Sequence, residues 1–179
     1  KNFRGMMGIP RELTLVKTEE GYLLRQKLVQ ELEEQKVKKL EAVLDSKSDK
    51  CVDYTQKESA AVEIVVKLEE DKDMVVDLYG TKCLYHEGVL KIEGIAQRTE
   101  GVAGAAREFT DKEEIKEGQT YRELKMNTIG KPEKLSLLSD GEILEVTVND
   151  GLLSEAYETV LDVRKGEITV QAEGKAKVE

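Results

Sequence analysis

Residues 143–151 read Ile-Leu-Glu-Val-Thr-Val-Asn-Asp-Gly, and this stretch decides the fold class. Successive side chains of a β-strand point to opposite faces, so the alternation places Leu144, Val146 and Val148 on one face. Asn149-Asp150-Gly151 is a strong hairpin signal because these residue types tolerate positive φ. The stretch therefore predicts a strand that buries these three apolar side chains and ends in a hairpin turn.

The same kind of pattern continues on both sides of this stretch. Short apolar runs predict strands at 61–68, 74–79, 89–93, 135–138 and 168–170, and the first of these runs is rich in β-branched residues. Turn signals separate them at 71–73, 80–82, 85–88 and 130–133. Strands and turns at a spacing of roughly 8–12 residues are typical of sandwiches and barrels. The sequence therefore predicts an all-β, two-sheet antiparallel β-sandwich of the lectin or galectin type over about residues 51–178, with no repeat that would indicate a solenoid.

The N-terminal segment, residues 2–27, also alternates. Leu13 and Leu15 are separated by polar residues, Thr18-Glu19-Glu20-Gly21 predicts a turn, and residues 22–26 predict a returning strand. No other part of the chain resembles a sheet that these strands would join. We therefore predict orphaned strands with an apolar face, held in order by self-association of the chain.

Residues 28–44 permit two interpretations. Leu28, Leu32, Val37, Leu40 and Leu44 fit the stripe of one long amphipathic helix. The alternative is a short helix that ends near Gln35 and is followed by a strand carrying Val37, Leu40 and Val43. We accordingly expect three parts: remnant strands at 1–27, a linker with a short helix at 28–44, and a sandwich domain at 45–179.

Composition excludes several classes of function. The chain has 179 residues and a formal net charge of −9, and such an acidic surface repels nucleic acid. No apolar run approaches the roughly 20 residues that a membrane-spanning helix needs. The first ten residues carry no sustained apolar stretch of the signal-peptide kind. We expect neither nucleic acid nor a membrane as partner. The compartment stays open, with the cytoplasm slightly favoured over secretion of a parent protein.

Candidate catalytic and metal-binding residues are few. His86 is the only histidine and stands in the predicted turn at 85–88, so a Ser-His or Cys-His arrangement is not indicated. Cys51 and Cys83 are far apart and favour semi-buried thiols over a metal site or a disulfide. Adjacent carboxylates on a strand point to opposite faces and cannot share a substrate. Such pairs are Glu33-Glu34, Glu69-Glu70 and Glu113-Glu114. We therefore assign no catalytic residue, no metal ligand and no cofactor, and ligand-binding residues remain unassigned.

Four segments, in order, resemble glycoside hydrolase family 32, the family of β-fructofuranosidases, sucrose-6-phosphate hydrolases and levanases. The most specific is the stretch 4–15, Arg-Gly-Met-Met-Gly-Ile-Pro-Arg-Glu-Leu-Thr-Leu, which resembles the closing segment of the family's last propeller blade. Residues 26–32 are similar to the linker that follows it, and residues 137–151 to a late hairpin of the family's C-terminal sandwich. Arg98-Thr99-Glu100-Gly101 resembles a sandwich loop. Phe3 and Thr147 depart from the family's usual tryptophan and aromatic residue.

This resemblance implies the fold and the activity of a larger parent protein. Family members hydrolyse β-fructosidic bonds with retention, using an Asp nucleophile and a Glu acid/base about 5–5.5 Å apart on a five-bladed propeller. A further Asp stabilises the transition state. Their motifs, Trp-Met-Asn-Asp-Pro-Asn-Gly, Arg-Asp-Pro and Glu-Cys, do not occur in this sequence. Five blades of roughly 40–50 residues would not fit in it either.

Three hypotheses of different classes follow. The first is a non-catalytic C-terminal accessory domain that supports the catalytic propeller of a sucrose, sucrose-6-phosphate or fructan hydrolase and that contributes to a homo-oligomer. The second is a carbohydrate-binding, lectin-like module, which would need exposed aromatic side chains; the candidates are Tyr79, Tyr85, Tyr121 and Tyr157, each with a core or rim position as the alternative. The third is a free-standing interaction protein built on a helix at 28–44. The resemblance favours the first.

Overall fold

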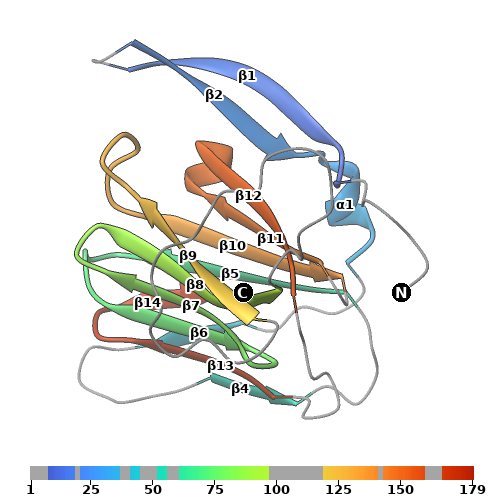
Figure 1. Cartoon of the computed structure of the whole chain (residues 1–179), viewed down its shortest axis with the longest axis vertical. Coiled ribbons are helices and arrows are strands. Elements are labelled where there is room, and N and C mark those ends of the chain that lie inside the picture. The colour runs from blue at the N-terminus through green and yellow to red at the C-terminus, as the bar shows by residue number, and fades with distance from the viewer. Residues whose placement is uncertain are drawn as a thin grey trace.

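The computed structural model describes residues 8–18, 21–36, 41–44, 52–55, 61–96, 119–140, 143–159 and 167–179. Within these ranges the chain forms two six-stranded antiparallel sheets and one two-stranded sheet. The two large sheets lie face to face, and the two-stranded sheet projects from one end of them (Figure 1). The predicted all-β sandwich is confirmed.

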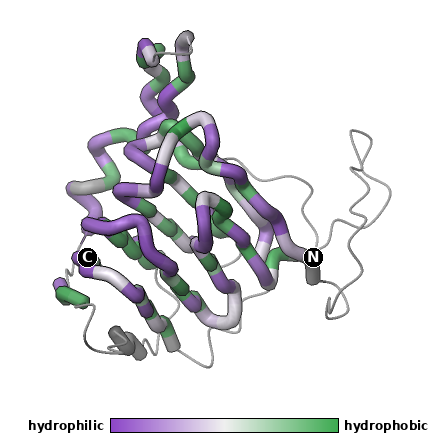
Figure 2. The backbone as a smooth tube through the Cα atoms, turned by 90° about the vertical axis from the view of Figure 1, so that its left-hand side faces the viewer, coloured by the Kyte–Doolittle hydropathy of each residue, from purple (hydrophilic) through white to green (hydrophobic). Residues whose placement is uncertain are grey.

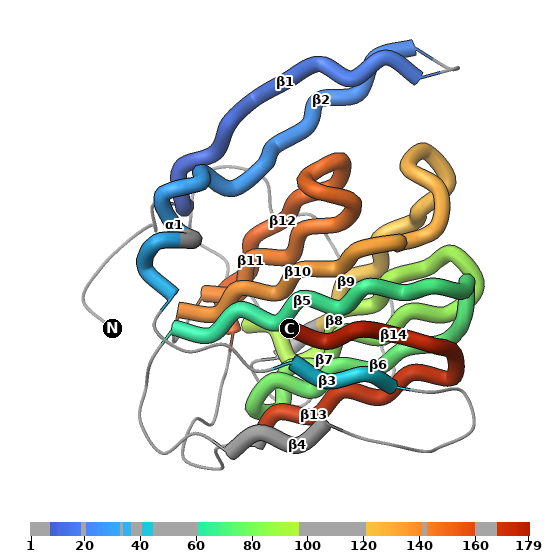
Figure 3. Tube along the Cα trace, turned by 180° about the vertical axis from the view of Figure 1, so that it is seen from behind, coloured from blue at the N-terminus to red at the C-terminus, as the bar shows by residue number. Residues whose placement is uncertain are grey.

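We name the large sheets after their inner strands. The β5 sheet has the order β12 (Leu153–Glu158), β11 (Ile143–Val148), β10 (Lys134–Asp140), β5 (Val62–Leu68), β14 (Ala176–Val178), β3 (Ala42–Leu44). The β6 sheet has the order β4 (Val52–Thr55), β13 (Glu167–Ala172), β6 (Met74–Leu78), β7 (Thr81–His86), β8 (Val89–Ala96), β9 (Gln119–Lys125). Figure 3 shows β14 beside β5 and β3 at the edge of the same sheet, so the chain's last strand is paired on both sides.

The core lies between the inner faces of the two sheets. Hydrophilic and hydrophobic residues alternate along most strands (Figure 2), which is the pattern of sheets with one face toward the core. Side chains with at most 1% exposure come from both sheets: Leu44, Val66, Met74, Val76, Leu78, Cys83, Leu90, Ile92, Leu135, Leu137, Leu144, Val146, Val148 and Val170. These side chains form one continuous apolar core between the two sheets.

The hairpin predicted at 143–151 is present, with a difference on its second face. Leu144, Val146 and Val148 are buried as expected, and β11 pairs with β12 through the turn η1 (Asn149–Gly151). Glu145 is also buried, with 2% exposure. Alternation predicts the core face correctly but gives no sign that another segment would cover the outer face. That segment is the N-terminal part of the chain.

The N-terminal part forms a hairpin, a helical turn and a linker. Strands β1 (Arg11–Thr18) and β2 (Gly21–Leu28) pair along their whole length, and α1 (Glu31–Glu34) follows. The described part of 28–44 thus contains one short helix, and the single long helix is wrong because Ala42–Leu44 is a strand. The three residues of β3, which we expected in the linker, belong to the β5 sheet. Val43 is in that strand, whereas Val37 and Leu40 lie outside the described residues.

The turn predicted at 85–88 is shorter than expected. Strand β7 runs through to His86, and only Glu87 and Gly88, with φ of 43° and 79°, make the turn to β8. Polar residues at 85–87 suggested a longer turn, but Tyr85 is a core side chain with 2% exposure. Cys51, Glu113-Glu114 and the segment 98–101 lie outside the described residues.

Candidate functional site

Two carboxylates lie in one cross-strand row on the outer face of the β5 sheet. Glu63 on β5 is opposite Leu138 on β10, which is opposite Glu145 on β11. Strands in a sheet are about 4.8 Å apart, so the two carboxylates are on the same face and two strands apart. Each is engaged by a basic side chain from the N-terminal segment. These two contacts make the site by which the hairpin is attached to the sandwich.

The first contact centres on Glu145. Its Oε1 accepts a hydrogen bond from the backbone N–H of Ile9 at 2.9 Å, and its Oε2 forms an ion pair with Nη2 of Arg11. Nη1 of Arg11 also donates to Oγ of Ser154 and to the carbonyl oxygen of Gln26 at 3.3 Å. One guanidinium–carboxylate pair thus joins β1, β2, β11 and β12. Its charge-assisted hydrogen bonds satisfy a carboxylate that is 2% exposed.

Gly151 leaves room for β2 to lie close to the sandwich beside the Arg11–Glu145 pair. Gly151 has φ of 93°, and a Cβ at this position would lie 2.4 Å from the carbonyl oxygen of Gln26, the same oxygen that Arg11 contacts. The backbone of β2 therefore lies directly against the turn η1. The glycine of the hairpin signal at 149–151 serves two purposes, because it permits the positive φ of the turn and the close approach of β2.

The second contact centres on Glu63. Its Oε1 accepts a hydrogen bond from Oγ of Ser136 at 2.6 Å, and its Oε2 forms an ion pair with Nζ of Lys36, just after α1. The Lys36 and Glu63 side chains are 26% and 16% exposed, so this pair is more exposed to solvent than the Arg11–Glu145 pair. The two contacts hold the beginning and the end of residues 9–36 on one face of the sandwich.

Neither contact has a signal in the sequence. Arg11 stands in the Pro-Arg-Glu-Leu stretch, and Glu145 is a polar residue in an alternating strand. A glutamate between apolar residues on a strand is ordinarily solvated, and only the tertiary position of β1 makes this one buried.

The candidate catalytic and metal-binding residues of the sequence have the following environments. Among them, no group of three or more His, Cys, Asp or Glu is placed to hold a metal ion. Burial raises the pKa of the Cys83 thiol, so the thiolate form that acts as a nucleophile is disfavoured. His86 is exposed, and its Nδ1 lies 2.6 Å from Oδ2 of Asp73, a contact that raises the pKa of His86. Glu69 and Glu70 are both exposed in the turn after β5.

The four tyrosines considered for sugar stacking have other environments. Tyr79 and Tyr85 are buried, and Oη of Tyr85 donates to Oδ1 of Asp71 at 2.5 Å. Tyr157 packs against the core. Tyr121 is half-buried opposite Glu93 on the outer face of the β6 sheet, and Nζ of Lys91 lies 4.5 Å from the ring centroid. One face of this ring is thus occupied by a cation.

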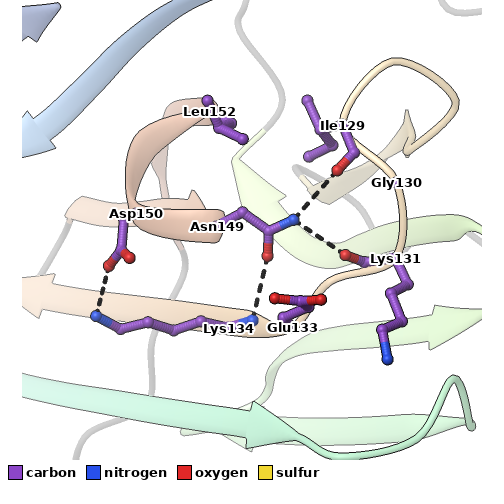
Figure 4. A pocket seen from close by; sticks show the side chains of 8 residues that line it. All are labelled: Ile129, Gly130, Lys131, Glu133, Lys134, Asn149, Asp150 and Leu152. Atoms are coloured by element: carbon purple, nitrogen blue, oxygen red, sulfur yellow. Dashed lines mark hydrogen bonds and ion pairs between the residues drawn. The ribbon is translucent and has the colours of Figure 1, made fainter. Parts of the chain in front are cut away.

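A shallow pocket of about 510 Å³ lies beside the turn η1 (Figure 4). Asn149 organises it, because its Nδ2 donates to the carbonyl oxygens of Ile129 and Lys131 while its Oδ1 accepts from the N–H of Lys134. The Lys134 ammonium also pairs with Asp150 at 2.7 Å, which holds the pKa of that carboxyl below its usual range. The polar groups of Asn149 are thereby used in fixing the loop before β10.

Within the described part of the chain, no helix has the length and apolarity to cross a membrane.

Comparisons with known proteins give a likeness of fold. No family model matches the chain, and no curated protein matches its sequence. Among solved structures, exo-inulinase from Aspergillus awamori superposes with a TM-score of 0.60 at 12% identity, over 96% of this chain and 35% of that enzyme. β-Fructofuranosidase from Schwanniomyces occidentalis, in complex with fructosyl-erythritol, gives 0.52 at 16% identity, over 96% and 39%. The chain thus spans little more than a third of either enzyme, and shares their fold over hairpin and sandwich together.

Proposed function

We propose that this chain is the non-catalytic C-terminal accessory domain of a β-fructosidase of glycoside hydrolase family 32, which hydrolyses sucrose, sucrose 6-phosphate or a fructan. Its partner is a five-bladed catalytic propeller that precedes Lys1 in the same polypeptide. The observation that carries this proposal is the fold likeness over 96% of the chain, which includes the hairpin as well as the sandwich.

The state of the hairpin supports a role at a domain boundary. Among the described residues β1 and β2 pair only with each other. Four large apolar side chains on one face of the hairpin are 47–72% exposed: Leu13, Leu15, Tyr22 and Leu24. An apolar face of this kind on a firmly attached element is typical of an interface with another domain or chain. We assign its cover to the propeller.

In this role the sandwich is a structural support and takes no part in the chemical reaction. It would carry the hairpin in a fixed orientation through Arg11 and Glu145 and so support the last blade of the propeller. The catalytic carboxylates would come entirely from the partner domain, in agreement with the absence of the family's three motifs from this sequence.

The proposal is tested by extending the chain and measuring hydrolysis. The coding sequence upstream of Lys1 should encode a propeller with the three carboxylate motifs. The extended protein should release fructose from sucrose, inulin or levan, and residues 1–179 alone should not. An unrelated upstream sequence would overturn the proposal. Fructose release by the 179-residue chain that survives further purification would overturn it as well.

A further inference from the structure

The two ionic contacts under the N-terminal segment share a row but not an environment. The Arg11 and Glu145 side chains are 15% and 2% exposed, whereas those of Lys36 and Glu63 are 26% and 16% exposed. Glu145 also receives a backbone hydrogen bond from Ile9, and Arg11 makes two further contacts with Ser154 and Gln26. The contact at Glu145 is therefore the less solvent-exposed of the two.

This difference determines how each contact responds to water and salt. Ions screen exposed charges, with a Debye length of about 3 Å at 1 M salt, but they screen buried pairs much less. A lysine ammonium is a hydrated point charge on a flexible stem, whereas the guanidinium offers a rigid fork of donors. The Lys36 contact is thus the one that salt can open.

The backbone around the contacts differs in the same direction. At the root of the hairpin the N–H of Val29 bonds to the carbonyl oxygen of Pro10 at 3.3 Å, and Gly151 lies against β2. On the other side, α1 has only four residues. A single helical turn is marginal in water and depends on its tertiary contacts. Loss of the Lys36 contact would therefore free α1 without disturbing the hairpin root.

We propose that residues 9–36 are fastened to the sandwich by a two-stage clasp. Arg11 and Glu145 are the permanent stage and act as positioning residues for the hairpin. Lys36 and Glu63 are the releasable stage, and their separation frees α1 and the start of the linker while the hairpin keeps its orientation. This device belongs to the chain itself and does not depend on the proposed function.

Hydrogen–deuterium exchange of the 179-residue chain tests this order. Between low salt and about 1 M salt, exchange of the amides at residues 31–36 should rise severalfold, because screening weakens the outer pair. Exchange at residues 26–28, beside the permanent stage, should remain within error. A parallel rise in both segments at the same salt concentration would overturn the two-stage order.

Three lysine- and arginine-to-methionine variants complete the test. Lys36→Met should raise exchange at 31–36 already at low salt and abolish its salt dependence, with the hairpin unaffected. Arg11→Met should raise exchange in both segments. Lys67→Met is the matched control, because Lys67 is on β5 like Glu63 but pairs with Glu179 at 2.7 Å. Increased hairpin exchange in Lys36→Met equal to that in Arg11→Met would contradict the proposal.

Discussion

The sandwich and the hairpin use opposite means to stay in place. The sandwich buries a continuous apolar core between two sheets, and Glu145 is the one charged residue among its described buried side chains. The hairpin leaves Leu13 and Leu15 exposed at 62% and 72% and attaches through a buried ion pair. Burial of apolar area stabilises a contact without fixing its orientation, because the hydrophobic effect is non-directional. The hydrogen bonds of a guanidinium–carboxylate pair do fix the orientation of the two groups. The sandwich is thus held together by its own core, whereas the position of the hairpin depends on the directed contacts of Arg11.

The largest effect that separates the two regions should come from leucine truncation. Leu137→Ala removes a side chain with 1% exposure at the centre of the core, and we expect a loss of about 2–5 kcal/mol in the free energy of unfolding. Leu15→Ala removes a side chain that is 72% exposed, and we expect a change within about 0.5 kcal/mol. Urea unfolding followed by circular dichroism measures both values. Comparable losses would mean that the hairpin face is covered in solution.

The same leucines test whether the isolated chain associates through its hairpin, which stays a prediction here. The double variant Leu13→Ser and Leu15→Ser should lower the apparent mass in light scattering if the exposed face pairs with another copy. A chain starting near Leu28 should behave in the same way. An isolated chain that is already a monomer at high concentration would refute the association.

Removing one partner of the ion pair should have the next largest effect. Arg11→Met leaves the Glu145 carboxylate without its main partner, and removal of one member of a buried ion pair costs about 3–5 kcal/mol while the other stays buried. The cost has a ceiling, because the hairpin can detach and let water reach Glu145. We therefore expect a moderate loss of global stability and a large rise in amide exchange across β1 and β2.

A double variant distinguishes the loss of the ion pair itself from the cost of leaving one buried charge without a partner. Arg11→Met combined with Glu145→Leu removes both charges and should recover most of the lost stability, because buried pairs replaced by apolar groups are often neutral. Additive losses in the two single variants, with no recovery in the double, would show that Arg11 and Glu145 do not interact in solution.

Two glycines provide a smaller and matched comparison. Gly151→Ala places a Cβ 2.4 Å from the Gln26 carbonyl oxygen, whereas at Gly130 no heavy atom lies within 4 Å of the added Cβ. Both have positive φ, at 93° and 71°, so each substitution carries backbone strain of about 1–2 kcal/mol. Only Gly151→Ala should also raise exchange in β2. Equal effects of both variants on β2 would rule out the close approach.

The sequence was sufficient for the sandwich because period-two alternation reports directly which residues face a core. Leu144, Val146 and Val148 lie where their pattern places them. The attachment of the hairpin could not be predicted in this way. It joins Arg11 to Glu145 across 134 positions, and neither residue has a local pattern that identifies the other. The same limit explains the shortened turn at Glu87-Gly88, since packing against the opposite sheet decided that Tyr85 belongs to a strand.

The smallest expected effect concerns acid and the C-terminal strand. Hydrogen bonds from Lys67 and Lys177 hold the pKa of Glu179 at about 2, below its ordinary 4.5. A carboxylate with a lowered pKa in the folded state contributes stability above about pH 4.5, and this contribution is lost as the pH falls toward 2. Because the Lys67 and Glu179 side chains are 44% and 34% exposed, solvent screening limits it to below about 1 kcal/mol. The free energy of unfolding of Glu179→Gln should therefore be slightly lower than that of the unmodified chain near neutral pH and match it near pH 2.

The backbone hydrogen bonds between Glu179 and Val65 do not need the carboxylate, so β14 should stay paired in the variant. Amide exchange in the hairpin should not change, because this pair lies on the sandwich. A difference that persists near pH 2 would assign the effect of Glu179 to packing, not to its charge.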